Sequence, residues 1–276
     1  MLVACLVHLL ATDVTVTTRP PPFPMPTLIP LLALLWSTSI LCAAEGAVLQ
    51  RWDFEGDQPF HDLKIEGEPP VIIADPQNPA NRVMHAVLRP HAERPERSEV
   101  RFDRILEGQE RWVGCRIYRP DAEQFRRVCL FQLGPISGAP GRNGRGLYQI
   151  LAWKRGEQLT WSFRSYLSRV GEQDQDDQAG PLTVGTWEDW VLHLKLRADA
   201  DGLITVWRNG QKIIERSGPN AFPQDRIAVK WGAYIGKGNL PEQETHAYFD
   251  DIVIGDQTAR YEDVAPGHRS PLPPQP

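Results

Sequence analysis

Apolar and polar residues alternate with a period of two along many short segments of this chain. Such alternation is typical of β-strands, whose successive side chains point to opposite faces of a sheet. Turn-forming residues separate the segments, and no stretch shows a convincing long helix. We predict strands over Leu49–Phe54, Val71–Ala74, Val83–Arg89, Glu96–Phe102, Arg111–Tyr118, Arg127–Leu133, Gly146–Trp153, Gln158–Leu167, Trp187–Leu196, Leu203–Arg208, Gln211–Glu215, Ile227–Tyr234 and His246–Ile254.

Two features of this pattern predict how the strands are used. In the segment 187–197, one Trp and three Leu residues share a face, which we expect to point into a core. The Asn209-Gly210 pair between two predicted strands is typical of a two-residue type I′ hairpin. We therefore predict an all-β fold, a concanavalin A-like β-jelly-roll sandwich of two curved antiparallel sheets.

The first 44 residues have the pattern of a secretory signal. The apolar run Leu28–Leu41 is shorter than the ~20 residues of a membrane-spanning helix, and small residues follow it up to Ala44. We predict cleavage after Ala44 and a secreted or periplasmic protein without membrane contact once the signal is removed. An uncleaved anchor is the alternative, and Met25 is a second candidate start.

The remaining chain is expected to form one domain. We assign residues 45–262 to a single β domain and residues 263–276, which are rich in proline, to a disordered tail. Cys115 and Cys129 lie on successive predicted strands. An oxidising compartment would permit a disulfide between them, and two buried free thiols are the alternative.

Composition narrows the classes of partner. The net charge is -5, from 30 Lys and Arg against 35 Asp and Glu, which argues against a broad nucleic-acid-binding surface. No Cys/His spacing resembles a zinc site. We expect a monomer without nucleic-acid partners.

Two segments carry charged or amide groups on one predicted face. In Arg97-Ser98-Glu99-Val100-Arg101, the residues Arg97, Glu99 and Arg101 point to the same side of a strand. Gln132 follows the apolar residues of its own strand, so it should face a groove or a partner. Each pattern alone is also compatible with an ordinary solvated face.

A third segment combines an ammonium group and a phenol. Lys230, Gly232 and Tyr234 share one face of their predicted strand, with apolar residues on the other. Because glycine has no side chain, we expect open space at Gly232 through which a substrate approaches Lys230 and Tyr234.

Taken in order, these segments resemble a known group of enzymes. Arg-Ser-Glu-Val-Arg, then Phe-Gln, then Lys-x-Gly-x-Tyr is the motif order of the β-jelly-roll polysaccharide lyases, which include alginate lyases, glucuronan lyases and heparin lyase I. The similarity extends over Glu96–Ile254. The segments Gly185–Trp190, Asp201–Gly210 and Tyr248–Ile252 resemble the glucuronan and heparin lyase branch most.

The resemblance implies cleavage of an anionic uronate polymer by β-elimination. Arg97 and Gln132 would hold the uronate carboxylate, which makes the proton on carbon 5 acidic. Tyr234 would transfer protons, and Lys230 would promote its ionisation or bind the chain. The further residues expected to bind substrate are Arg101, Glu99, Arg116, His193 and Trp231.

One position departs from the family pattern. Many members carry His two residues after the Gln, where this chain has Gly134. In one interpretation Tyr234 is both base and acid, which suits glucuronate or mannuronate, whose proton and leaving oxygen lie on the same side of the ring. In the other, the protein has lost catalysis and only binds polysaccharide. His193 or His246 would be the alternative source of an imidazole.

Two other functions fit an all-β sandwich. A carbohydrate-binding, lectin-like domain would stack sugars on Trp153, Trp207 or Trp231. A glycoside hydrolase would need two carboxylates across a cleft. No such pair lies on a predicted strand, and Glu99 is flanked by two arginines that should keep it ionised.

We expect no required cofactor, although a structural calcium ion fits many sandwiches of this type. The run Asp174–Asp177 is acidic but lacks the spaced glycine of a calcium loop, so we predict a solvated loop there. The stretch between Leu167 and Pro181 is long enough for a mobile flap.

Overall fold

The computed structural model describes residues 47–90, 96–106, 108–120, 127–135, 147–166, 174–221, 226–236 and 243–267. All of them belong to one compact unit of the chain, which begins at Ala43. Nearly all of the predicted signal, residues 1–44, falls before that unit and outside the described residues. Within the described ranges, no helix is long and apolar enough to cross a membrane.

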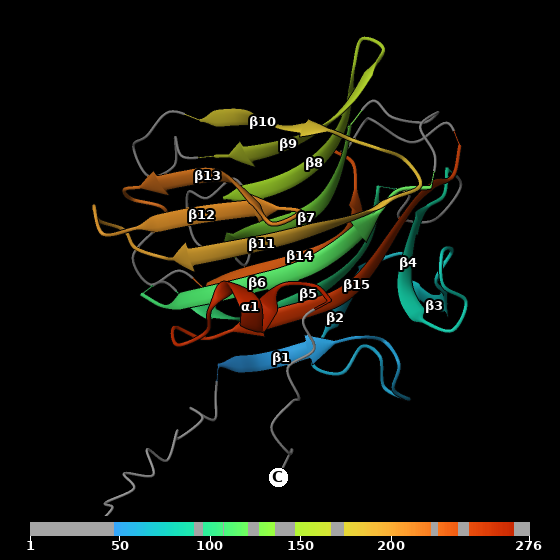
Figure 1. The fold of residues 1–276 in the computed structure, drawn as a ribbon, viewed down its shortest axis with the longest axis horizontal. Helices are drawn as coiled ribbons and strands as arrows, with labels where there is room; N and C mark the ends of the chain where they lie inside the picture. Colours follow the sequence, from blue (N-terminus) through green and yellow to red (C-terminus); the bar gives the residue numbers. More distant parts are fainter. Residues whose placement is uncertain are drawn as a thin grey trace, which may run out of the picture. The chain divides into compact units, whose positions relative to one another are not determined.

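The first of two antiparallel sheets has eight strands (Figure 1). They are β1 (Val48–Trp52), β3 (Val71–Ala74), β4 (Arg82–Leu88), β6 (Glu110–Tyr118), β11 (Trp187–Lys195), β12 (Leu203–Arg208), β13 (Gln211–Ser217) and β15 (Thr245–Gly255). Their order is β13-β12-β11-β6-β15-β4-β3, and β1 pairs with the second half of β15.

The second sheet has seven strands. They are β2 (Lys64–Gly67), β5 (Arg97–Leu106), β7 (Arg127–Pro135), β8 (Tyr148–Arg155), β9 (Gln158–Ser165), β10 (Gln175–Pro181) and β14 (Arg226–Tyr234). Their order is β10-β9-β8-β7-β14-β5-β2. Strand β14 therefore lies between β5 and β7, although it comes from near the other end of the chain.

The predicted all-β jelly-roll sandwich is confirmed, and every predicted strand is present with small shifts at its ends. The structure adds two strands that the pattern did not predict, β2 and β10. The solvated loop expected at Asp174–Asp177 is wrong, because Asp176 and Asp177 lie in β10. Asp176 pairs with Arg164 of the adjacent strand β9, and Asp177 pairs with Arg216 of β13 in the first sheet. The part of the predicted flap that becomes β10 is likewise a paired strand.

The hairpin prediction also holds. Asn209 and Gly210 have φ angles of 49° and 78°, the two positive values that a type I′ turn requires. They join β12 to β13, whose residues Arg208 and Gln211 face each other across the turn.

Tryptophan side chains hold the two sheets together. Trp161 of the second sheet meets Trp190 of the first edge to face, with ring centroids 5.3 Å apart. Trp52 of the first sheet lies 6.0 Å from Trp231 of the second. All four are essentially buried, and such rings contribute both large apolar area and edge-to-face attraction to the core.

Cys115 and Cys129, the two of the four cysteines that the structure describes, are free thiols, which is the second of the two alternatives. Cys115 lies on β6 and Cys129 on β7, so they belong to different sheets, and both are buried. Burial raises the pKa of both thiols, which keeps them protonated and unreactive.

The C-terminal boundary lies further along the chain than predicted. Helix α1 (Tyr261–Val264) packs on the outer side of the first sheet, where Val264 is fully buried beside Val253. The disordered tail predicted from residue 263 is therefore wrong for residues 263–267, and its remainder lies outside the described residues. The reason is apolar burial of Val264 and Ala265, which the many nearby prolines obscured.

Candidate active site

The four residues predicted to be catalytic lie together on the outward face of the second sheet. Arg97 comes from β5, Gln132 from β7, and Lys230 and Tyr234 from β14 between them. Arg97 faces Tyr234 across the β5–β14 pair, and Gln132 faces Lys230 across the β7–β14 pair. The Arg97 guanidinium lies 4.6 Å from the centre of the Tyr234 ring.

A β-bulge explains how Gln132 reaches this face from an apolar strand. The pairing of β7 with β8 shifts between Cys129 and Phe131. The bulge places both Leu130 and Phe131 in the core and leaves Gln132 on the opposite, outward face. Gln132 is nevertheless largely buried, with a relative exposure of 8%.

Glu99 lies beneath these residues and does not face the solvent. It is 1% exposed, receives a hydrogen bond of 2.5 Å from Gln132 Nε2, and pairs with Arg97 Nε at 3.3 Å. Burial raises the pKa of Glu99 to about 7, although Arg97, Lys230 and the Gln132 amide all act against the shift. The expectation that its flanking arginines keep Glu99 fully ionised is therefore wrong, and so is its assignment as a substrate contact.

Gly232 has a different role from the one predicted. A Cβ atom there would lie 2.2 Å from the Ser98 carbonyl oxygen and 2.6 Å from Glu99 Cα, and its φ angle is +142°. Glycine is needed because β5 approaches β14 closely at this point. The Glu99 side chain occupies the space that was expected to admit substrate.

Sequence reasoning missed Glu66, the acidic centre of the site. Its carboxylate accepts from Lys230 Nζ at 2.7 Å and forms ion pairs with Arg97 and Arg101. Partial burial would raise the pKa of Glu66, but the hydrogen bond and charge of Lys230 and the two arginines lower it below its usual range. Glu66 therefore stays ionised and holds three cations together.

The ionic contacts continue to the edge of the sheet. Arg101 Nε pairs with Asp103 Oδ1 at 2.6 Å, and Asp103 in turn accepts from Lys64 Nζ at 2.7 Å. The pKa of Asp103 is lowered: hydrogen bonds and charges from Lys64 and Arg101 outweigh the burial that would raise it. The charged groups of this cluster are Lys64, Arg97, Arg101 and Lys230 against Glu66, Glu99 and Asp103. Positive charge is in excess there even when Glu99 is ionised.

A chain of hydrogen bonds runs from Glu99 in the other direction along the sheet. Gln149 Nε2 donates to Gln132 Oε1 and Tyr166 Oη donates to Gln149 Oε1, both at 3.3 Å. Because Gln132 accepts on its oxygen and donates to Glu99 through its nitrogen, the orientation of its amide is fixed. One of its two amide hydrogens is committed to Glu99. Gln149 and Tyr166 were not predicted, since single polar residues in apolar segments carry no signal of their own.

Three residues predicted to bind substrate lie elsewhere. Trp231 is fully buried between Trp52 and Phe131 in the core, so it contacts no substrate. His193 lies on β11 of the first sheet, where it stacks on Trp112 at 4.1 Å and pairs with Glu110. The prediction that Trp231 and His193 belong to this site is wrong, because a period of two does not reveal which sheet a strand joins.

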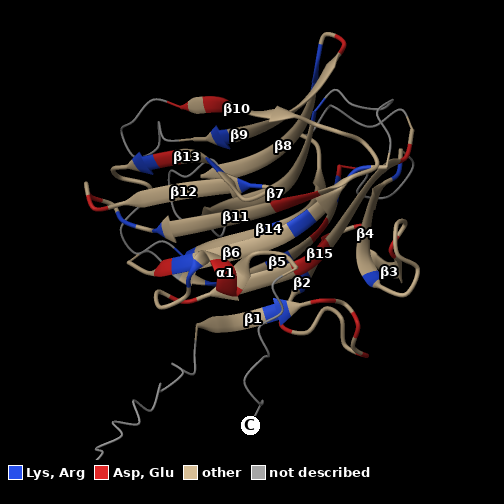
Figure 2. Ribbon diagram, viewed as in Figure 1, with Lys and Arg blue, Asp and Glu red and all other residues tan. Residues whose placement is uncertain are grey.

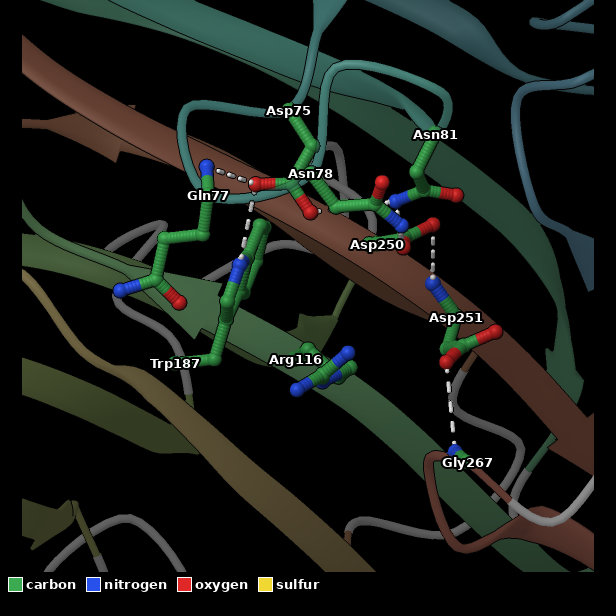
Figure 3. A pocket seen from close by; sticks show the side chains of 9 residues that line it. All are labelled: Asp75, Gln77, Asn78, Asn81, Arg116, Trp187, Asp250, Asp251 and Gly267. Atoms are coloured by element: carbon green, nitrogen blue, oxygen red, sulfur yellow. Dashed lines mark hydrogen bonds between the residues drawn. The ribbon is translucent and has the colours of Figure 1, made fainter.

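Arg116 also lies on the first sheet, in β6, and lines a separate pocket (Figure 3). The cavity has a volume of about 290 Å³. Arg116 Nε pairs with Asp189 at 3.0 Å, and its guanidinium lies 5.2 Å from the Trp187 ring centre. Its prediction as a member of the same site is wrong for the same reason.

This pocket also contains three acidic residues, Asp75, Asp250 and Asp251. Asp75 and Asp250 already accept hydrogen bonds from Asn81, and Asp251 accepts one from the Gly267 amide. Among the described residues, no group of three or more His, Cys, Asp or Glu is arranged to hold a metal.

The other histidine considered as a source of an imidazole is His246. It lies on β15 of the first sheet, with Nδ1 3.0 Å from Nε2 of His85. The fourth described histidine, His61, precedes β2, and its ring lies 5.9 Å from the Trp52 ring at a tilt of 36°. In the part of the chain that the structure describes, therefore, no histidine shares the face of Gln132 and Tyr234.

Charge is distributed over both sheets. Lys and Arg positions are interspersed with Asp and Glu positions along the strands (Figure 2). The cationic excess of the candidate site is therefore a local feature of a protein whose net charge is negative.

Solved structures of other proteins share this fold. An endo-β-1,4-glucuronan lyase from the fungus Trichoderma reesei has a similar fold, with a TM-score of 0.58 and 16% identity over 80% of this chain and 100% of that one. The alginate lyase Aly36B has a TM-score of 0.51 and 13% identity over 79% of this chain and 100% of that one. No curated protein sequence matches at a significant level.

The sequence itself matches a family model. The model described as "Polysaccharide lyase" covers residues 62–253, which include Glu66 and every residue of the cluster from Arg97 to Tyr234. That range is well over half of the chain. The chain therefore belongs to the polysaccharide lyase family and is a polysaccharide lyase.

Proposed function

We propose that this lyase is exported and cleaves a glucuronan- or mannuronate-type polymer by β-elimination on the outward face of the second sheet. The observation that carries the proposal is the convergence of Arg97, Gln132, Lys230 and Tyr234 on three adjacent strands. The excess positive charge around Glu66 favours an anionic polysaccharide over a neutral one.

The uronate carboxylate binds to the remaining amide hydrogen of Gln132 and to the neighbouring cations. Neutralising that carboxylate makes the proton on carbon 5 of the sugar acidic. The fixed amide of Gln132 requires no reorientation during this step, since Glu99 and Gln149 hold both of its ends.

Tyr234 then serves as both base and acid. Its phenolate takes the proton from carbon 5, and the electron pair released forms the double bond between carbons 4 and 5 as the bond from carbon 4 to oxygen breaks. The phenol so formed returns the proton to the departing oxygen. The Arg97 guanidinium over the ring stabilises negative charge on the phenol oxygen.

This single-residue mechanism determines the preferred substrate. Gly134 faces Ala228 of β14 and offers no imidazole, and the described histidines lie on other parts of the molecule. One proton-transfer group works only where the proton and the leaving oxygen lie on the same side of the ring. Glucuronate and mannuronate meet that condition, whereas guluronate and iduronate do not.

Absorbance of the conjugated double bond tests the proposal. The purified protein is incubated with glucuronan, mannuronate-rich alginate, guluronate-rich alginate and heparin, and ultraviolet absorbance is followed. We expect product from the first two polymers, loss of at least about a hundredfold in kcat for Tyr234→Phe, and normal rates for Tyr261→Phe, whose ring lies against Trp207 on the other sheet. Efficient cleavage of guluronate or iduronate linkages would contradict the single-residue mechanism.

Export and oligomeric state belong to the same proposal. We expect a secreted or periplasmic monomer whose first residue is Glu45, and no cofactor or nucleic acid in the reaction. N-terminal sequencing of the protein recovered outside the cytoplasm and light scattering of the purified enzyme test these points. A mature protein that retains Met1 or Met25 would refute cleavage after Ala44.

A further inference from the structure

A second group of cations lies on the same sheet as the candidate active site, on strands β7 to β9. Arg127 begins β7, Trp153 and Arg155 lie at the end of β8, and Arg164 lies in β9. The guanidinium carbons of Arg155, Arg127 and Arg164 lie 4.3, 5.1 and 5.9 Å from the Trp153 ring centre. We call these four residues the Trp153 cluster.

The three guanidinium groups of the cluster all lie within 5.9 Å of the centre of one indole ring. Asp176 of β10 accepts from Arg164 at 2.6 Å and lies 3.5 Å from Arg155, so two guanidinium groups share one carboxylate. Three cations held on one indole ring repel one another, and a bound anion relieves that repulsion. The Arg155 and Arg164 side chains keep 34% and 22% of their surface exposed, so a ligand can reach them.

Hydrogen bonds connect the cluster to the candidate active site. Arg127 Nη2 and Arg164 Nη1 donate to Tyr166 Oη at 3.5 and 3.4 Å. Tyr166 is the first donor of the chain that passes through Gln149 to Gln132. Every bond of this chain has its donor on the side of the arginines, so the cluster and the Gln132 amide form one directional network.

The register of the strands places the two groups along a common line. Lys230, Gln132, Gln149 and Arg164 face one another in turn across β14, β7, β8 and β9. At about 4.8 Å between strands, Arg164 lies roughly 14 Å from Lys230 along this line. That separation is on the scale of a few sugar residues, so a chain bound at Gln132 and running across the strands passes the Trp153 cluster.

We propose that the Trp153 cluster is a distal subsite that binds the carboxylates of uronate residues away from the cleaved bond. The proposal rests on the proposed function, because it takes the same polymer as ligand. Arg127, Arg155 and Arg164 bind the carboxylates, since guanidinium groups form paired hydrogen bonds with them. Trp153 is a positioning residue that orients the three guanidinium groups.

Kinetics on long and short substrates separate this role from catalysis. In Arg155→Gln/Arg164→Gln, we expect KM for long glucuronan or mannuronate-rich alginate to rise about tenfold or more, with kcat within about twofold of the wild type. Trisaccharides that reach only the Gln132 region should keep their KM. Trp153→Leu keeps every charge but removes the indole ring that orients the three guanidinium groups. It should raise the KM for polymer in the same way.

Two controls exclude a general effect of charge or folding. Arg104→Gln removes a guanidinium from the same sheet that is 63% exposed and pairs with Asp62, and it should leave KM for polymer nearly unchanged. Arg164→Lys keeps the charge but loses the paired hydrogen-bond donors of the guanidinium group. It should give a KM for polymer between that of the wild type and that of the double variant. Thermal melting of each variant within a few degrees of the wild type shows that the fold is intact.

A binding arm distinguishes failure of the subsite from failure of the proposed function. Titration of Tyr234→Phe with intact polymer measures binding without turnover, and its salt dependence should become shallower when Arg155 and Arg164 are replaced. If no polymer is cleaved but binding still depends on these arginines, the subsite stands and the proposed reaction fails. If binding and KM do not depend on them, or if trisaccharides are weakened equally, the subsite proposal is overturned.

Discussion

Glu99→Gln should remove a pH dependence from the stability of this protein. Glu99 is buried beneath the candidate active site, and burial raises its pKa to about 7 from an ordinary value of 4.5. Glutamine has nearly the same shape, retains an oxygen that accepts from Gln132, and does not titrate. The variant therefore isolates the cost of ionising a carboxyl group in this position.

The sign and size of the effect follow from linkage. Between the unfolded and folded pKa values, the folded protein binds a proton that the unfolded chain has released, so stability falls as pH rises through this window. A shift of one pKa unit corresponds to about 1.4 kcal/mol, so the full loss above the window is about 3 kcal/mol. For a chain of this size, that corresponds to a difference in Tm of roughly 6–12 °C.

The comparison with wild type is essential because another group acts in the opposite direction. Burial, with help from the charges of His246 and Arg89, lowers the pKa of His85 to about 4 from 6.5. The folded protein therefore binds fewer protons there, and the contribution of His85 to stability is lost as pH falls through that range. Because His85 is the same in both proteins, its contribution cancels when the stability of Glu99→Gln is compared with that of wild type at each pH.

Urea unfolding between pH 4.5 and 8 measures the predicted difference. The stability of Glu99→Gln relative to wild type should rise by about 3 kcal/mol across this range, while the exposed variant Glu215→Gln should remain within about 0.5 kcal/mol of wild type throughout. Parallel curves for Glu99→Gln and wild type would refute the argument, because they would show that Glu99 ionises equally easily in both states.

Three further predictions concern the core and the thiols. Trp231→Ala should lower the free energy of unfolding by about 3–5 kcal/mol in urea denaturation, because the ring is fully buried between the sheets; a loss below about 1 kcal/mol would contradict its place in the core. Gly232→Ala should cost at least about 2 kcal/mol in the same assay, since the new methyl group would meet the Ser98 carbonyl; an unchanged midpoint would argue against that close approach. Cys115 and Cys129 should react with a thiol reagent only after unfolding, and a reductant should leave Tm unchanged; a drop in Tm on reduction would indicate a disulfide.

Sequence alone predicts the candidate site where its residues lie on strands with clear alternation. Arg97, Lys230 and Tyr234 stand on segments whose faces a period of two defines, whereas Gln132 reaches the same face only through the bulge in β7. The order of their motifs along the chain further indicates that the three segments contribute to one site.

The rest of the site depends on pairing that no single segment encodes. Glu66 lies on a four-residue strand, Lys-Ile-Glu-Gly, too short and too mixed in polarity to be recognised before it pairs with β5. The burial of Glu99 depends on how closely β14 approaches β5 at Gly232. Arg116 and His193 were misplaced because an outward-facing polar residue has the same pattern in either sheet.

The position of β14 between β5 and β7 has a consequence for how the enzyme acquires activity. The strand that carries Lys230 and Tyr234 completes both the hydrogen bonding of its sheet and the proton-transfer site. Its paired residues lie between 92 (Ile227–Pro135) and 137 (Tyr234–Arg97) positions earlier in the chain. Such long-range pairing makes folding slow, and a nascent chain cannot hold a working site until β14 has been synthesised and inserted. Recovery of turnover during refolding should therefore coincide with completion of the sheet, which makes activity itself a reporter of the final folding step.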